Sequence, residues 1–251
     1  MSKHILLGIS GGIAAYKSCE LVRLLKKQGH SVSVVMSKAS TEFISPLTFQ
    51  ALSGNPVLTD THENSLGNGM AHINLTREAD ALVIAPATAN TIAKISHGIA
   101  DNLLANLVAA RKCPLAVAPA MNVEMWNNPA NLRNIEQLRS DGITVFQPAY
   151  GEQACGEIGL GRMLEAADLA DLISDLWTPK ILLGKRILIT AGATFEAIDP
   201  VRGITNISSG QMGTALARAC RAAGAKVTLI YGQLQTTIPT GLFHTEQAVS
   251  A

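Results

Sequence analysis

Short apolar runs alternate with segments of helical periodicity along most of the chain, and this alternation restricts the folds that it can form. The predicted strands of the first part are residues 5–9, 31–36, 81–85, 115–118 and 144–146. The predicted helices are residues 13–28, 88–97, 100–111, 132–140 and 166–176. Short apolar strands alternating with helices are typical of a parallel sheet in an α/β protein. We therefore predict an α/β fold: a Rossmann-like (flavodoxin-like) parallel sheet with helices on both faces, whose ligands bind at the carboxyl ends of the strands.

A second unit begins after a stretch that reads as a linker. A strand over residues 186–190, a helix over 210–223 and a strand over 226–231 are predicted there, and the pattern fades after Gly232. One such unit cannot cover both faces of a sheet. The predicted organisation is a first domain over residues 1–178, a linker over 179–184 and an incomplete second α/β unit over 185–251.

The composition argues against several classes of function. Twenty Lys and Arg stand against nineteen Asp and Glu, and aromatic residues make up 4% of the chain, which disfavours a nucleic-acid surface. No apolar run approaches the ~20 residues that span a bilayer, so no membrane segment is expected. The four cysteines are far apart and form no CxxC pair, which indicates no metal site and a reducing, cytoplasmic location.

The segment from Gly8 to Ala14 lies between the first predicted strand and the first predicted helix. Glycines there permit a tight turn, Ser10 could cap the helix, and free N–H groups would face an anion. A phosphate-bearing cofactor fits this turn at Ser10, Gly11 and Gly12, with Ser37 after the second strand as a further ligand. An ordinary tight turn explains the same residues, because the segment matches neither a dinucleotide-binding fingerprint nor a P-loop.

Two further segments follow predicted strands. In residues 86–91, Pro86 is expected to end the strand and Thr88 to cap the next helix. Asn90 offers both a donor and an acceptor, which suits a planar ring with imide-like edges. In residues 119–126, Asn122 suits an amide or carboxylate ligand. A capped helix start and simple core packing are the alternatives for these two segments.

The glycine-rich segment 151–163 is predicted to form a mobile flap. Cys155 lies within it in polar surroundings, and an accessible cysteine can act as an acid or a nucleophile. Histidine as a residue type suits general base chemistry near neutral pH, which makes His72 a candidate, although a lone histidine is more often an ordinary surface residue.

Four of these elements in this order resemble the flavin-dependent cysteine decarboxylases, and among them the phosphopantothenoylcysteine decarboxylases. The elements are AHINL around His72, PATANT at 86–91, PAMNVEMW at 119–126 and ACGEIGLGRM at 154–163. Residues 190–194 and 199–210 resemble the opening of the phosphopantothenate–cysteine ligase domain that is fused to such decarboxylases in bacterial coenzyme A biosynthesis proteins. The resemblance implies decarboxylation of 4′-phosphopantothenoylcysteine to 4′-phosphopantetheine.

The resemblance implies FMN as the cofactor and no metal for this reaction. The implied FMN-binding residues are Ser10, Gly11, Gly12, Ser37, Phe43, Thr88, Ala89, Asn90 and Thr91. The implied substrate-binding residues are Asn122, Met125, Ala154 and Arg162. His72 would serve in acid–base chemistry, and Cys155 would protonate carbon. The substrate thiol would be oxidised to a thioaldehyde, CO₂ would leave, and the ene-thiol would then be reduced.

The resemblance also implies an oligomeric state and a role for the second unit. Relatives assemble from trimers with the flavin at a subunit interface, so a homo-oligomer is expected. Arg202 and Asn206 match substrate-facing positions of the ligase domain, which would use CTP and Mg²⁺ when complete. The later ligase segments are absent, so we expect a truncated ligase domain without turnover of its own. The alternatives are a flavin prenyltransferase, a peptidyl-cysteine decarboxylase, or a regulatory binding protein of the same fold.

Overall fold

The computed structural model describes residues 2–60 and 71–250, with residues 71–74 described by their backbone alone. Contacts within the chain divide it into two compact units, Met1–Ala170 and Asp171–Ala251.

The first unit is built on a six-stranded parallel sheet with the order β3-β2-β1-β4-β5-β6. Its strands are β1 (His4–Ile9), β2 (Ser31–Met36), β3 (Leu58–Thr59), β4 (Ala81–Ala87), β5 (Leu115–Pro119) and β6 (Thr144–Val145). The strand order reverses direction between β1 and β4. The connections after these two strands therefore leave in opposite directions, and a crevice for a ligand opens at their carboxyl ends.

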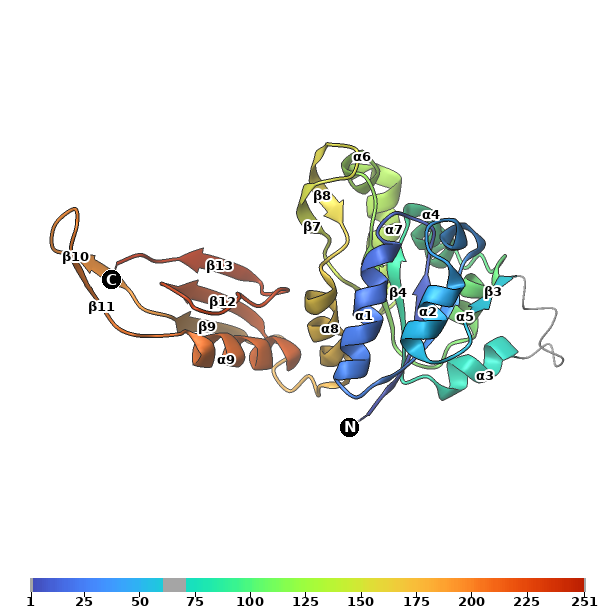
Figure 1. Cartoon of the computed structure of the whole chain (residues 1–251), viewed down its shortest axis with the longest axis horizontal. Helices are drawn as coiled ribbons and strands as arrows, with labels where there is room; N and C mark the ends of the chain where they lie inside the picture. The colour runs from blue at the N-terminus through green and yellow to red at the C-terminus, as the bar shows by residue number, and fades with distance from the viewer. Residues whose placement is uncertain (1, 61–70, 251) are drawn as a thin grey trace. The chain divides into compact units, whose positions relative to one another are not determined.

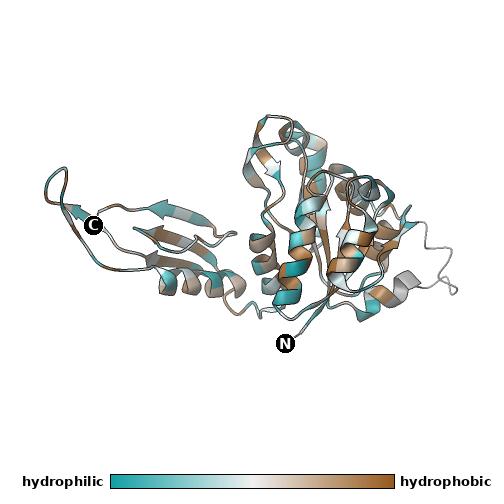
Figure 2. Cartoon of the chain, viewed as in Figure 1, coloured by the Kyte–Doolittle hydropathy of each residue, from teal (hydrophilic) through white to brown (hydrophobic). Residues whose placement is uncertain are grey.

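Helices cover both faces of this sheet, as predicted (Figure 1). The helices that begin in this unit are α1 (Ala15–Lys27), α2 (Pro46–Ser53), α3 (Ala71–Glu78), α4 (Ala89–Ser96), α5 (Leu103–Ala110), α6 (Val123–Asn127), α7 (Pro129–Ser140) and α8 (Ala166–Ser174), with a 3-10 helix at Lys38–Glu42. Helix α1 contacts β2 and β4, whereas α5 and α7 share a core with alternate residues of the strands. All seven residues of β4 are buried, as expected for a central parallel strand. The strands are correspondingly hydrophobic, while the helices mix hydrophobic and hydrophilic residues (Figure 2).

The connections after β1 and β4 differ from the sequence prediction at Pro86 and Ser10. Pro86 does not end its strand, because β4 continues to Ala87. Ser10 does not cap α1, whose N-cap is Ala14 without a side-chain bond. The Ser10 hydroxyl instead donates to the Pro86 carbonyl at 2.7 Å and accepts from the Thr88 N–H at 2.9 Å. Ser10 therefore joins the ends of β1 and β4.

The glycine-rich segment 151–163, which is predicted to be a mobile flap, contains regular secondary structure that the sequence did not indicate. Most of it forms an antiparallel hairpin of β7 (Ala149–Glu152) and β8 (Ile158–Arg162). Gly161 in this hairpin has φ +138, and a Cβ there would lie 2.3 Å from the Met121 carbonyl oxygen. The Met121 N–H also donates to the Gly161 carbonyl at 2.9 Å, so the hairpin backbone lies directly against the end of β5.

The second unit contains a parallel sheet of the order β13-β12-β9. Its elements are β9 (Arg186–Ala191), β10 (Phe195–Ala197), β11 (Gly203–Thr205), α9 (Gln211–Ala222), β12 (Lys226–Tyr231) and β13 (His244–Gln247). The predicted βαβ unit is confirmed, and β13 is an additional strand. Helix α9 packs on β9 and β12, and β10 and β11 form an antiparallel hairpin.

A buried arginine fixes the start of the second unit. Arg221 of α9 donates from Nε to Asp175 at 2.8 Å and from Nη2 to Asp171 at 3.1 Å. Burial raises the pKa of the Asp175 carboxyl, and the hydrogen bond and charge of Arg221 oppose that shift. Throughout the described residues, no helix combines the length and apolar character needed to cross a membrane.

Candidate active site

A cavity of about 980 Å³ lies at the carboxyl ends of the first unit's strands. The residues that line it come from the connections after β1, β2, β3, β4 and β5 and from the β7–β8 hairpin. Among them are Gly11, Gly12, Ser37, Lys38, Asp60, Thr88, Ala89, Asn90, Thr91, Lys94, Asn102, Met121, Asn122, Met125, Gln153, Ala154, Cys155 and Arg162. The cavity therefore occupies the place at which doubly wound sheets bind their ligands.

The turn between β1 and α1 offers an anion-binding end of the cavity. A Cβ on Gly11 would lie 2.5 Å from the Cβ of Ala39, so this position accepts only glycine without movement of its neighbour. A Cβ on Gly12 would find its nearest neighbour at 3.6 Å, on the Thr88 side chain. None of the described hydrogen bonds uses the N–H groups of residues 11–14. These groups lie at the positive end of the 13-residue helix α1 and suit a phosphate.

The start of α4 forms a polar wall after β4. Thr88 is the N-cap, as predicted, and its hydroxyl accepts from the Thr91 N–H at 3.3 Å. Its hydroxyl also lies 3.1 Å from that of Thr91. Asn90, in the first turn of the helix, is exposed and lines the cavity. Its amide therefore remains able to pair with a polar ring edge.

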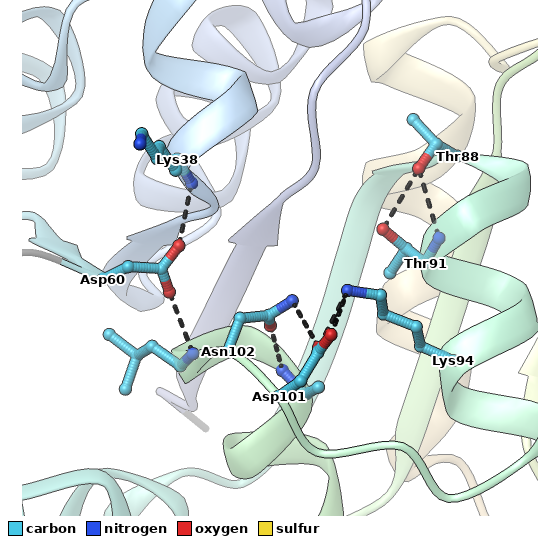
Figure 3. Close-up of polar contacts among 9 residues, drawn as sticks. Lys38, Asp60, Thr88, Thr91, Lys94, Asp101 and Asn102 are labelled. Atoms are coloured by element: carbon cyan, nitrogen blue, oxygen red, sulfur yellow. Dashed lines mark hydrogen bonds and ion pairs between the residues drawn. The ribbon is translucent and has the colours of Figure 1, made fainter.

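Asp60 joins two walls of the cavity (Figure 3). One carboxylate oxygen accepts from the Lys38 N–H at 3.0 Å, and the other accepts from the Leu103 N–H at 2.9 Å. Both donors are the first residues of helices, where backbone N–H groups have no partner within the helix. Beside them, Lys94 forms an ion pair with Asp101 at 2.7 Å.

Asn122, in the β5–α6 connection, lines the cavity and contacts the β7–β8 hairpin. The Asn122 Oδ1 accepts from the Glu124 N–H at 2.8 Å, which makes Asn122 the N-cap of α6. Its Nδ2 donates to the Cys155 Sγ at 3.3 Å and to a carboxylate oxygen of Glu157. The Cys155 thiol lies 3.6 Å from that same oxygen. The amide of Asn122, the thiol of Cys155 and the carboxylate of Glu157 thus form one cluster of mutual contacts.

Further polar contacts hold the β7–β8 hairpin in place beside this cluster. The Gln153 Oε1 accepts from the Val123 N–H at 2.9 Å, and its Nε2 donates to the Leu160 carbonyl at 3.2 Å. At the base of the hairpin, Lys17 of α1 is buried and donates to the Met163 carbonyl at 2.9 Å. These contacts fix the cysteine-bearing turn against the end of β5.

The structure brings most of the predicted site residues to one cavity. Two are elsewhere in the first unit: Ser10 is buried beneath the cavity wall, and the ring of Phe43 is 47% exposed and outside the lining. His72 belongs to α3, but its side chain lies outside the described part of the structure. Arg202 and Asn206 are exposed residues of the second unit, where the Arg202 Nε donates to Asp199 at 2.7 Å.

Sequence reasoning missed several residues of the site. Lys17, Lys38, Asp60 and Lys94 line the cavity, and Glu157 contacts two residues that do. Asp60 directly follows β3, so its place after a strand was a usable signal, but β3 has only two residues. Glu157 lies two residues after Cys155, and only the hairpin turn shows that both reach Asn122.

Comparisons with known proteins agree with this architecture. Residues 1–178 match the family described as Flavoprotein, and residues 182–251 match the DNA/pantothenate metabolism flavoprotein C-terminal domain. The chain is 52% identical over 240 residues to the coenzyme A biosynthesis bifunctional protein CoaBC of Vibrio parahaemolyticus, which covers 96% of this chain. It is 44% identical over 238 residues to the protein of the same description from Escherichia coli, which covers 94% of it. The chain spans about 60% of the length of these relatives.

Solved structures resemble the first unit. A cysteine-to-serine variant of a PPC decarboxylase, complexed with pantothenoylaminoethenethiol, aligns with a TM-score of 0.64 and 36% identity, covering 70% of this chain and 99% of that one. The FMN binding protein AtHal3 aligns with a TM-score of 0.61 and 37% identity, covering 70% of this chain and 96% of that one. The family match, the sheet order and the cavity at the strand ends agree, and the chain belongs to the flavoprotein family through residues 1–178.

Proposed function

We propose that this chain is an FMN-dependent decarboxylase that converts 4′-phosphopantothenoylcysteine to 4′-phosphopantetheine and CO₂ in coenzyme A biosynthesis. The observation that carries the proposal is the contact of Asn122 with Cys155, at 3.3 Å, on the rim of a cavity that also contains an anion-binding helix start. This arrangement pairs a carboxylate ligand with a proton donor. The similarity to coenzyme A biosynthesis proteins and to a PPC decarboxylase supports the same reaction.

The described residues fit FMN. The free N–H groups at Gly11 and Gly12, with Ser37 beside them, suit the phosphate. Residues 88–91 would lie along the flavin ring, with Asn90 facing its polar edge. Phe43 completes the proposed set, and its exposed ring suits a flavin shared between subunits. A homo-oligomer built from trimers is part of the proposal.

The chemistry divides between the cofactor and the chain's own residues. When bound, FMN would supply the oxidation of the thiol-bearing carbon and return the electrons at the end. Oxidation to a thioaldehyde provides an electron sink next to the carbon that loses CO₂. Asn122 would hold the leaving carboxylate, and Cys155 would protonate the carbon left behind. The remaining proposed roles are acid–base chemistry for His72 and substrate contacts for Met125, Ala154 and Arg162.

The hairpin contributes by closing the site on the solvent side. Its backbone is fixed to the end of β5 through Met121 and Gly161, and its turn carries Cys155. A substrate enclosed beneath it would be protected from water while the reactive thioaldehyde exists.

The second unit favours coenzyme A synthesis over decarboxylation of a peptide. Its match to a pantothenate metabolism domain would be unexpected in a peptide-modifying enzyme. We propose the organisation of a decarboxylase domain over 1–178, a linker over 179–184 and a ligase-like segment over 185–251. Arg202 and Asn206 would face a phosphopantothenate-like ligand, with CTP and Mg²⁺ required only by a complete ligase domain. A cytoplasmic location accords with this metabolic role.

Product analysis of two variants tests the residue roles. Cys155→Ser should still release CO₂ from 4′-phosphopantothenoylcysteine but accumulate the ene-thiol, because the carbon is no longer protonated. His72→Asn should retain FMN and lose CO₂ release. Mass spectrometry of the products and the flavin absorbance measure both. Undiminished 4′-phosphopantetheine formation by Cys155→Ser would remove that residue from the mechanism, and unchanged turnover by His72→Asn would remove the histidine.

A further inference from the structure

The amide of Asn122 has a fixed orientation. Its Oδ1 is engaged with the Glu124 N–H at 2.8 Å, so the two hydrogens of Nδ2 face the hairpin. One is directed to the Cys155 Sγ, and the other is directed to a carboxylate oxygen of Glu157. The donors that would hold the carboxylate of a ligand are thus occupied by groups of the chain itself.

The geometry of the hairpin turn brings Glu157 to the Asn122 amide. The Gln153 N–H donates to the Glu157 carbonyl at 2.8 Å, and the Gly156 N–H donates to the Gln153 carbonyl at 2.8 Å. Gly156 has φ +85, a conformation that favours glycine. The backbone of Glu157 is therefore fixed, whereas its side chain is exposed and can move. Among the described ion pairs, none involves Glu157.

We propose that Glu157 occupies the site of the substrate's carboxylate on Asn122 and is exchanged for it when substrate binds. The proposal rests on the decarboxylase function proposed above. The Glu157 carboxylate and the substrate carboxylate would accept the same hydrogen bond from the Asn122 amide. Binding of the substrate carboxylate would therefore displace Glu157. The product has lost its carboxylate, so it cannot compete for Asn122. Glu157 then returns to Asn122, where it does not compete with the bound product.

The position of Cys155 gives this exchange a consequence for the reaction. Its Sγ lies 3.6 Å from the Glu157 oxygen that accepts the hydrogen bond from Asn122. A substrate carboxylate in the place of Glu157 would lie equally close to the thiol. The carbon that loses CO₂ is attached to that carboxylate, so it would lie on the side from which the thiol delivers a proton. Glu157 thus marks the place where CO₂ leaves and the proton arrives.

Binding of two matched ligands to the FMN-loaded protein tests the proposal. The acid probe is 4′-phosphopantothenoylserine, in which a hydroxyl replaces the reactive thiol. The second probe is its decarboxylated counterpart, the aminoethanol amide, which differs by the carboxylate alone. Isothermal titration would compare the wild type with Glu157→Gln and Glu157→Ala. Glu136→Gln is the control, since Glu136 is an exposed residue of α7 with the same charge change and lies outside the cavity lining.

Removal of an intramolecular competitor should strengthen binding of the acid alone. The Kd of the acid should fall about threefold to tenfold in both Glu157 variants, the range expected when a charge-assisted hydrogen bond at an exposed site no longer competes. The Kd of the decarboxylated probe should stay unchanged, and Glu136→Gln should resemble the wild type. In turnover, KM should fall more than kcat changes.

Three results would overturn the proposal. Equal strengthening of both probes would mean that Glu157 acts through its charge on the phosphate rather than at Asn122. Weaker binding of the acid would make Glu157 a substrate ligand. No binding of either probe to the wild type would refute the proposed decarboxylase substrate itself, and the exchange with it.

Discussion

Asp60 is expected to stabilise the first unit because one carboxylate satisfies the N-termini of two helices. Its oxygens accept from the Lys38 N–H at 3.0 Å and from the Leu103 N–H at 2.9 Å. The N-cap side chains of Ser37 and Asn102 reach only the third residue of each helix. Asp60 therefore serves groups that the caps leave unpaired, and its negative charge lies at the favourable end of both helices.

The expected loss follows from these two contacts. A hydrogen bond to a charged group contributes ~1.5–3 kcal/mol, and because Asp60 is half-buried we take about 1 kcal/mol for each. Asp60→Ala should therefore lower the free energy of unfolding of the first unit by about 2 kcal/mol, or ~4–8 °C in Tm. Lys38 and Asn102 line the cavity, so FMN binding should weaken as well.

Thermal unfolding followed by circular dichroism measures the loss, and a flavin titration measures the affinity. Asp101→Ala is the matched control, because Asp101 is 52% exposed and pairs with Lys94. An exposed ion pair contributes only ~0.2–1 kcal/mol, so the control should lose much less. Equal Tm values for the two variants would refute the reasoning that Asp60 joins the walls of the cavity.

Two further predictions concern the β1–α1 turn and the amino-terminal ends of the central strands β1 and β4. Gly11→Ala should destabilise the first unit by ~1–3 kcal/mol in chemical denaturation, because its Cβ would lie 2.5 Å from the Cβ of Ala39, whereas Gly12→Ala should leave stability nearly unchanged. The backbone N–H of His4, with help from the Lys3 ammonium, holds the pKa of the Asp80 carboxyl below its usual range. The folded-state pKa is thus the lower one, so the stabilisation is present above the unfolded pKa and is lost as pH falls through the folded pKa. The effect of Asp80→Asn on the free energy of unfolding should therefore be larger at pH 7 than at pH 2, and a constant effect would contradict this assignment.

The parts of the fold that the sequence predicts are those with strong local periodicity. The second strand and the strand at Lys226–Tyr231 have the predicted bounds, because each is a short run rich in β-branched and apolar residues with buried residues at its second and fourth positions. Strand β13 was missed because its four residues are exposed and mostly polar. The two strands of the β7–β8 hairpin were not predicted because the glycines of this segment were interpreted as the sign of a mobile flap, whereas Gly161 is needed for close approach to the backbone of Met121.

In the site, too, residues whose partners are close in sequence were predicted correctly, whereas residues with distant partners were not. Thr88 was predicted as a cap because the cap and its helix are adjacent in sequence. Asp60 pairs with residues 22 and 43 positions away, and no local pattern contains such pairs. Ser10 was assigned to the helix that follows it, but its hydroxyl contacts Pro86, 76 residues away. Tertiary contacts across the sheet decide the role of a polar side chain that follows a strand.

The central claim is that the cavity at the strand ends binds FMN and supports decarboxylation. The most direct measurement is the absorbance spectrum of the purified chain, followed by detection of CO₂ after addition of 4′-phosphopantothenoylcysteine. The account predicts a yellow protein, or one that becomes yellow with added FMN, that releases CO₂. A colourless protein that FMN cannot reconstitute, or a flavin-loaded protein that releases no CO₂, would contradict it.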